Sequence, residues 1–178
     1  MGAEGKVSSN RRDFLFVATA SVFAVGTAGV VWPVIDSLNP DADVRAVAGS
    51  VEVDLSSIEV GQRITVMWRS MPVFIDHRSQ GQIAEARATD LDELRDPQRD
   101  EDRALRPEWL IQIGICTHLG CIPLGQQSGD PLGDWGGWFC ACHGSQYDTS
   151  GRVRKGPAPR NLDIPPYAFA SDTIVRIG

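Results

Sequence analysis

Cysteine and histidine are scarce in this chain. Its 178 residues contain four cysteines and three histidines, and no cysteine precedes residue 116. A disulfide-rich secreted scaffold spreads its cysteines along the chain, so the gathering of all four within residues 116–142 excludes that class and indicates a local site. An excess of basic residues is also lacking. Lys and Arg number 17 against 23 Asp and Glu, a net charge of −6, which argues against nucleic acid as a partner.

Internal repeats and low-complexity tracts are absent as well. The composition is 42% hydrophobic and 22% charged, which excludes a globally disordered chain. The length predicts one compact domain with a core of its own.

One long run without charge stands near the N-terminus. Residues 14–35 contain no charged side chain and lie between Asp13 and Asp36. As a helix this run would be about 33 Å long, close to the roughly 30 Å apolar core of a bilayer. The apolar region of a cleaved signal peptide is shorter, roughly 7–15 residues, and ends at small residues, whereas Trp32 and Pro33 close this run. We expect a transmembrane helix over residues 14–35, which Pro33 kinks or ends, rather than a buried helix or a cleaved signal.

Basic residues precede this run. Arg11 and Arg12, followed by Phe14 and Leu15, resemble a twin-arginine export signal, although any positive flank of a membrane helix would supply two arginines. Together with Lys6 they predict that residues 1–13 stay in the cytoplasm and that the rest of the chain lies across the membrane. Residues 36–50 contain Pro, Gly, Ser and alternating Asp, which predicts a flexible hinge with a transiently helical stretch at 46–48.

The remaining chain, residues 51–178, has the pattern of short strands separated by turns. Strands are expected over residues 51–55, 63–68, 71–76, 109–115 and 171–177. This pattern predicts an antiparallel sandwich or barrel-like domain. Residues 79–107 mix few apolar with many charged positions, which indicates a helix and loop inserted between strands. The charged run 99–103 is expected to be solvated, and His77 is expected to be a surface residue at a strand end rather than a ligand.

Two short segments carry the residues of a metal site. The first reads CTHLGC over residues 116–121, and the second reads CACHGSQYD over residues 140–148. Each holds a Cys-His pair and one extra cysteine. Two thiolates and two imidazoles suit either tetrahedral Zn²⁺ or a [2Fe–2S] cluster with two cysteines on one iron and two histidines on the other.

The two interpretations use the cysteines differently. A zinc site would tend to take Cys140 and Cys142 together as ligands. In the cluster interpretation one cysteine per loop is left over, and a bridge between these two would clamp the loops together. That interpretation has the ligands Cys116, His118, Cys140 and His143, and the leftover pair Cys121 and Cys142.

CTHLGC followed by CxCHGSxYD resembles the Rieske iron–sulfur proteins, and more narrowly the Rieske subunits of bacterial ubiquinol–cytochrome c reductases (cytochrome bc complexes). The resemblance covers nearly the whole chain, including the anchor, the hinge, residues 94–98 (LRDPQ) and residues 156–159 (GPAP). It implies a mainly β protein: a Rieske-type antiparallel β-sandwich head over residues 51–178, with a cluster-binding subdomain at about 114–160. The chain departs from the family at Ala141, where proline is common, and in a long inter-loop segment, 127–135.

The resemblance also implies roles for individual residues. One [2Fe–2S] Rieske cluster would be held by Cys116, His118, Cys140 and His143, with Cys121 and Cys142 bridged. Ser145 would donate to a bridging sulfide and Tyr147 to the Cys116 sulfur; such bonds, together with two neutral imidazole ligands, raise the reduction potential. His143 would face the quinol, and Leu119, Gly156 and Pro157 would belong to docking surfaces.

The function implied is that of an enzyme subunit, in which His143 and His118 are the catalytic ligands. The cluster would accept one electron, with a proton on an imidazole, from ubiquinol and pass the electron to a c-type cytochrome, contributing to proton translocation. The head would swing on the hinge between a cytochrome b subunit and a c-type cytochrome subunit, within a dimeric complex. The chain would be single-pass in the bacterial inner membrane, with the head periplasmic. Two alternatives remain: a Rieske subunit of another periplasmic oxidoreductase, such as the arsenite-oxidase type, and a zinc-binding module without a redox role.

Overall fold

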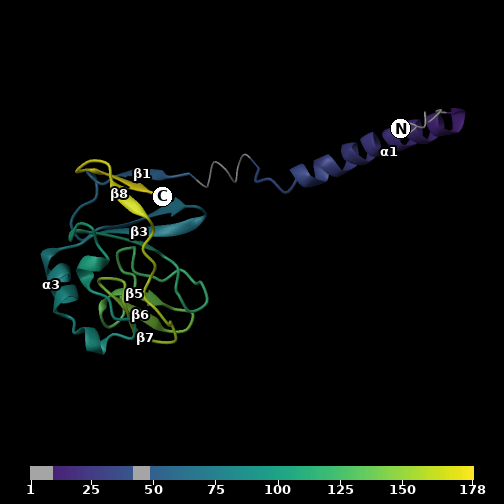
Figure 1. The fold of residues 1–178 in the computed structure, drawn as a ribbon. Coiled ribbons are helices and arrows are strands. Elements are labelled where there is room, and N and C mark those ends of the chain that lie inside the picture. Colours follow the sequence, from purple (N-terminus) through teal and green to yellow (C-terminus); the bar gives the residue numbers. More distant parts are fainter. Residues whose placement is uncertain (1–9, 42–48) are drawn as a thin grey trace, which may run out of the picture. The chain divides into compact units, whose positions relative to one another are not determined.

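The computed structural model describes residues 10–41 and 49–178. The chain divides into two units, Met1–Arg45 and Ala46–Gly178. Among the described residues, the first unit contains one long helix, and the strands all belong to the second, in the head at residues 51–178 (Figure 1). Two predicted segments lie partly outside the described residues. These are the cytoplasmic segment, of which residues 1–9 with Lys6 are not described, and the hinge, of which residues 42–48 with the stretch expected to be transiently helical are not described.

Helix α1 spans Arg11–Asp36 and begins with a capping box. The Asn10 side chain accepts from the Asp13 N–H at 3.0 Å, while the Asp13 carboxylate accepts from the Asn10 N–H at 3.2 Å. The helix continues three residues beyond Pro33, so this proline does not end it. None of its side chains is buried against protein, and it is the one helix among the described residues that is long and apolar enough to cross a bilayer.

The head consists of three antiparallel sheets of three strands each. The first has the order β1-β9-β8, with β1 at Val51–Asp54, β9 at Ile174–Ile177 and β8 at Tyr167–Phe169. The second has the order β2-β3-β4, with β2 at Arg63–Trp68, β3 at Met71–His77 and β4 at Trp109–Ile113. The third has the order β5-β6-β7, with β5 at Gly136–Cys140, β6 at Ser145–Asp148 and β7 at Val153–Lys155. In Figure 1, β5, β6 and β7 lie at the end of the head opposite β1 and β8.

The second sheet lies between two hydrophobic cores because successive side chains of a strand point to opposite faces. Val73 and Ile75 of β3 join a core with β9 residues such as Val175. Phe74, between them, belongs to the other core, with Trp138 of β5. These sheets confirm the predicted β-sandwich head. The β2–β3 hairpin turns through Arg69 and Ser70, both with positive φ, as a two-residue turn of type I′ requires.

The segment between β3 and β4 carries a helix and two short 3₁₀ turns, as predicted for 79–107. Helix α3, Gln80–Ala88, begins at Ser79, whose side chain accepts from the Gln82 N–H. It buries Ile83 and Ala86. The 3₁₀ turns η1, Leu91–Glu93, and η2, Asp100–Asp102, follow.

The prediction that residues 99–103 are solvated holds for Arg99, Glu101 and Asp102 but is wrong for Asp100 and Arg103. Asp100 and Arg103 are only 1% and 3% exposed. Asp100 accepts a hydrogen bond of 2.5 Å from Arg78, which follows β3, and one of 2.7 Å from the Ser150 hydroxyl. Arg103 donates to the Ser150 carbonyl at 2.5 Å and the Leu162 carbonyl at 2.7 Å, and burial lowers its pKa to about 10. A charge pattern alone does not show that a run has buried partners of opposite charge elsewhere in the chain.

Burial by itself raises the pKa of Asp100, but hydrogen bonds from Arg78 and Ser150 outweigh it and hold that pKa below its usual value. The ionised carboxylate therefore stabilises the fold at pH values above the unfolded-state pKa, about 3.9. This stabilisation is lost as the pH falls through the pKa of the folded state.

Replacing Asp100 tests this buried pair. D100A leaves the buried Arg78 guanidinium without its carboxylate partner, and the free energy of unfolding should fall by about 3–5 kcal/mol. The matched control is E101A, because Glu101 is exposed and pairs with Arg87 only at the surface; its effect should stay below about 1 kcal/mol. Urea unfolding followed by tryptophan fluorescence in detergent measures both. Equal effects of the two substitutions would contradict this account.

Candidate metal centre

Two turns of the same form carry the cysteines and histidines. The first follows β4, where the Gly120 N–H donates to the Cys116 carbonyl at 2.9 Å. The second joins β5 to β6, where the Gly144 N–H donates to the Cys140 carbonyl, also at 2.9 Å. Gly120 and Gly144 have φ of 84° and 75°, a region that side chains other than glycine rarely adopt. Each turn thus begins at a cysteine and carries a histidine two or three residues later, before the glycine that closes it.

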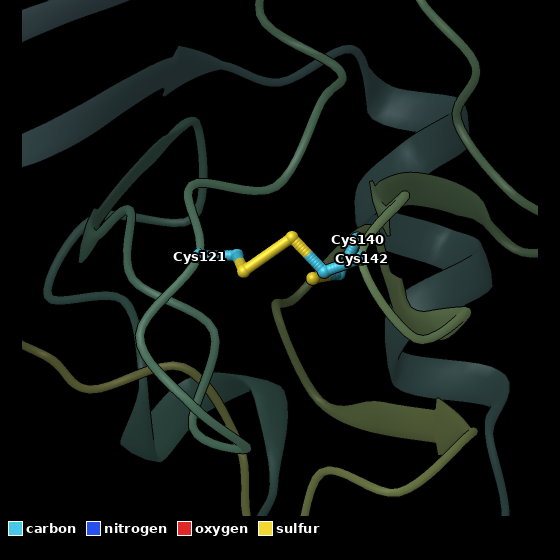
Figure 2. A group of neighbouring side chains, drawn as sticks. All are labelled: Cys121, Cys140 and Cys142. Carbon is cyan, nitrogen blue, oxygen red and sulfur yellow. A yellow bond between two sulfur atoms is a disulfide. The ribbon is translucent and has the colours of Figure 1, made fainter.

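A disulfide joins the two turns. Cys121 and Cys142, the leftover cysteines of the cluster interpretation, are bridged, with their Cα atoms 6.8 Å apart. Figure 2 shows the bonded sulfurs with the Cys140 side chain beside them. The sulfurs of Cys121, Cys140 and Cys142 lie within 4.8 Å of one another. Because two of these sulfurs are bonded to each other, they do not form a three-thiolate zinc site.

The remaining donors are two thiols and two imidazoles. Cys116 and Cys140 are free and each only 2% exposed. The rings of His118 and His143 lie edge to face with their centroids 4.7 Å apart. His118 is half-buried, and its Nδ1 is buried without a hydrogen-bond partner, while His143 is exposed.

This donor set fits a [2Fe–2S] cluster with mixed ligands. A buried nitrogen without a partner costs free energy, and a metal ion bound to His118 would remove that cost. Two buried thiols and two adjacent imidazoles, one of each kind on either turn, match the Cys₂His₂ ligand set of Rieske centres. We therefore take these four side chains as the candidate ligands.

Tyr147 of β6 provides a hydrogen bond to one thiol. Its hydroxyl donates to the Cys116 sulfur at 3.2 Å, and its oxygen accepts from the Thr117 N–H at 3.3 Å. Burial raises the pKa of Tyr147, and so does the bond to Cys116, so the phenol stays protonated as a donor. Burial alone raises the pKa of Cys116, but hydrogen bonds led by that of Tyr147 outweigh it and lower this pKa. The pKa of the Cys140 thiol is raised, first by burial and then by Cys116.

Ser145, the first residue of β6, has no exposed surface. Its oxygen accepts from the Ala158 N–H at 3.1 Å, which leaves its own hydrogen free to donate elsewhere. Its hydroxyl is one of the hydrogen-bonding groups that lower the pKa of Cys116.

The predicted docking residues lie on two loops. Leu119, directly after His118, is 71% exposed. Pro157 is exposed and Gly156 half-exposed on the loop that follows β7. A hydrogen bond of 2.6 Å from the Thr117 hydroxyl to the Arg160 carbonyl ties this loop to the first turn.

His77 does not join the site, as predicted, but it is not simply a surface residue. It is half-buried at the end of β3, where its Nδ1 lies 2.6 Å from the Ile58 carbonyl oxygen. Its ring stacks on that of Trp109, with the centroids 4.0 Å apart. Stacking and a backbone hydrogen bond satisfy this histidine without a metal.

Arg63 supports the site from β2, although the sequence gives no sign of it. Its guanidinium pairs with Asp76 at 3.1 Å and donates to the carbonyls of Gly125 and Gly137, at 2.8 and 2.7 Å. It also lies over the Trp138 ring, 4.3 Å from the centroid. Arg63 thereby fastens both ends of the inter-loop segment to the second sheet.

Thr117 was also missed, although its position between two candidate ligands in CTHLGC is a signal that could have found it. Its N–H fixes the phenol of Tyr147 and its hydroxyl fixes the Arg160 loop.

Comparison with known protein families gives two matches. Residues 1–41 match the family described as "Ubiquitinol-cytochrome C reductase Fe-S subunit TAT signal". Residues 98–167 match the "Rieske [2Fe-2S] domain". The second match includes both turns, the disulfide and β5–β7.

Curated relatives extend over almost the whole chain. The ubiquinol-cytochrome c reductase iron-sulfur subunit of Rhodospirillum rubrum is 61% identical over 170 residues, covering 96% of this chain and 92% of the relative. The subunit of that name from Blastochloris viridis is 52% identical, covering 100% and 98%. Among solved structures, a chain of "Hyperthermophilic respiratory Complex III" is similar with a TM-score of 0.53 at 25% identity, covering 89% of this chain and 97% of that one.

Replacing both bridged cysteines tests whether they support the site rather than bind metal. The bridge closes a loop of sequence separation 21, for which the chain-entropy model gives about 3 kcal/mol. C121S/C142S should therefore keep its iron and its visible absorbance but lose them at a lower temperature than the native chain. C116S, which removes a candidate ligand, should not bind iron at all. Iron retained in C116S but lost in the double variant would reverse the assignment.

Proposed function

Because this chain belongs to the family of the ubiquinol-cytochrome c reductase iron-sulfur subunits, we propose that it transfers electrons one at a time from ubiquinol to a c-type cytochrome through its two cysteine-histidine turns. It is a subunit of a cytochrome bc₁-type oxidoreductase complex with a Rieske [2Fe–2S] cofactor. The observation that carries the proposal is the pairing of two buried free thiols with two adjacent imidazoles across one disulfide.

The proposed ligands are Cys116 and Cys140 on one iron and His118 and His143 on the other. The burial pattern supports this division, because both thiols are buried while His143 is exposed. When bound, the cluster supplies one-electron chemistry at roughly −150 to +300 mV, against about −400 mV for plant-type ferredoxins, because two ligands are neutral imidazoles.

The protein tunes this site with hydrogen bonds to sulfur. The Tyr147 hydroxyl lies 3.2 Å from the Cys116 sulfur, and the Thr117 N–H orients it by occupying its oxygen. The Ser145 hydroxyl is oriented in the same way by the Ala158 N–H. Both donors favour the more negative, reduced state of the site, and thus strengthen it as an electron acceptor.

His143 is the proposed contact with the quinol. It is the exposed one of the two imidazoles, so a ring nitrogen that does not ligate iron is accessible to a quinol hydroxyl and can hold its proton. His118 is half-buried, so we assign it the role of an iron ligand that does not contact the quinol. Leu119, Gly156 and Pro157 are proposed to dock against the cytochrome b subunit and the c-type cytochrome subunit.

The other parts of the chain follow from this role. We assign residues 1–13 to the cytoplasm, 14–35 to the span of a bacterial inner membrane, 36–50 to the hinge and 51–178 to a periplasmic head, with the cluster-binding subdomain at about 114–160. The match of residues 1–41 and the length of α1 support this topology. We further propose that the complex is a dimer and that the head moves between the quinol site and the cytochrome haem.

The anchor assignment can be checked on the protein in its membrane. Residues 14–35 should remain in the mature chain, and a protease cut within residues 36–50 should release a soluble, coloured head from membranes opened on the periplasmic side. Intact inner-membrane vesicles with the cytoplasmic side outward should resist the same cut. An N-terminal sequence beginning beyond Ile35 would show instead that the apolar run is a cleaved signal.

The test of the function is the reduction potential of two variants, S145A and Y147F. A hydrogen bond to a charged group is worth roughly 1.5–3 kcal/mol, and about 1.4 kcal/mol corresponds to about 59 mV for one electron. Each variant should therefore lower the midpoint potential by about 60–130 mV and slow quinol-dependent reduction of cytochrome c.

The matched control for Y147F is Y167F, because the Tyr167 hydroxyl accepts from the Leu105 N–H outside the site. S171A serves likewise for S145A, since the Ser171 hydroxyl caps the turn before β9. Both controls should keep the native potential. Unchanged potentials in S145A and Y147F would reject the proposed donors.

A further inference from the structure

The loop after β7 packs directly on Ser145. Gly156 has φ of 91°, and a Cβ at this position would lie 2.5 Å from the Ser145 Cα. Two residues on, Ala158 has no exposed surface and donates its N–H to the Ser145 oxygen at 3.1 Å. A shift of this loop would therefore move the group that orients the Ser145 hydroxyl.

The segment between η1 and η2 holds this loop from outside. Arg95 Nη1 donates to the carbonyls of both Gly156 and Ala158, each at 2.6 Å. These two carbonyls lie on either side of Pro157, so a single guanidinium nitrogen fixes the backbone before and after that proline. Arg95 contacts neither a candidate ligand nor Ser145 through any of these bonds.

Asp96, the next residue, fixes the far end of the same loop. Its carboxylate accepts from the Asn161 N–H at 2.9 Å, and its carbonyl accepts from the Asn161 side chain at 3.0 Å. Asn161 in turn accepts from the Val153 N–H at 3.0 Å. The loop end is thus joined to β7 independently of Arg95, which leaves Arg95 to govern the part over Ser145.

We propose that Arg95 is a positioning residue for electron transfer: by holding the Gly156 and Ala158 carbonyls it keeps the Ala158 N–H on Ser145 and so fixes the direction of the Ser145 hydroxyl. This inference rests on the proposed donor role of Ser145 toward the cluster. Arg95 acts indirectly, through backbone groups of the loop and the Ser145 hydroxyl. Its replacement should therefore change the reduction potential of the cluster without the loss of any ligand.

The experiment is a redox titration of the full chain in its native membranes, followed by the EPR signal of the reduced cluster. R95M keeps the length and the apolar stem of the side chain and removes both hydrogen bonds. Loss of a well-oriented neutral hydrogen bond corresponds to roughly twofold to tenfold in an equilibrium constant. The midpoint potential should therefore fall by about 20–60 mV, at about 59 mV per tenfold for one electron. R95K, which keeps a donor and the charge, should restore at least half of that difference.

Two controls separate positioning from charge. K155Q removes a positive charge from the residue next to Gly156, where Lys155 makes an exposed ion pair with Asp134; its midpoint should stay at the native value. In the S145A background R95M should cause little further change, because two residues that act through one group are not additive. Hydrogen–deuterium exchange of the peptide over residues 156–161 should be faster in R95M than in the native chain.

Each outcome decides the matter. A native midpoint in R95M alongside a lowered one in S145A overturns the positioning role and leaves the proposed function standing. A shift in K155Q equal to that in R95M, or full additivity with S145A, assigns the effect to charge and likewise overturns it. A native midpoint potential in S145A contradicts both the donor role of Ser145 and the positioning role of Arg95. Because Arg95 is exposed, R95M should fold; if it does not accumulate, R95Q and R95K are compared by the same titration.

Discussion

The covalent bond between Cys121 and Cys142 is the constraint on which the rest of the site depends. Each turn is a small unit closed by one hydrogen bond from glycine to cysteine, and neither turn has a large core of its own. The bond holds the two turns against each other, and this brings the buried thiols of Cys116 and Cys140 to the inside and the imidazoles toward the surface. The sheets below it supply the rigidity that the turns lack.

That rigidity comes to a large extent from arginines that donate to backbone carbonyls. A guanidinium has five donors in a planar fork and remains charged at all ordinary pH values, so it can satisfy several loop carbonyls that have no strand partner. Among the described residues of the head, five arginines bind two or more carbonyls each in this way: Arg63, Arg95, Arg103, Arg106 and Arg152. In each case the residues joined are far apart in sequence, so these arginines replace a hydrophobic core where the chain is mostly loop.

The parts of this structure that were predictable from sequence are those with a local signal. Alternation located β1, and runs of strand-forming residues located β2 and β3. The spacing of cysteine and histidine identified the two turns, and the family resemblance implied which two cysteines are bridged. Strands β5 to β8 have three to five residues each, and β5 begins with Gly136 and Gly137, so they carry too little pattern to be seen. Their register is imposed by the turns and the neighbouring strands.

Burial of charge could not be predicted because it depends on partners distant in sequence. Asp100 reads as one acid among several, and only the fold brings Arg78 and Ser150 to it. The same holds for Arg95, which stands in a segment noted only for its resemblance to a family; its acceptors are more than sixty positions away. The candidate ligands were found from sequence. The groups that orient the hydrogen-bond donors to the sulfurs, such as Thr117 and Arg95, were not.

The division of β3 between two cores has a consequence for how the head comes apart. Val73 and Ile75 contribute to one core and Phe74 to the other, and β4 is shared likewise through Ile111 and Leu110. If β3 or β4 is displaced from one core, its side chains in the other core are displaced as well, because both sets of side chains belong to the same backbone. We therefore expect the two halves of the head to unfold as a single cooperative unit. A substitution that destabilises the metal end should also destabilise the sheet formed by β1, β9 and β8.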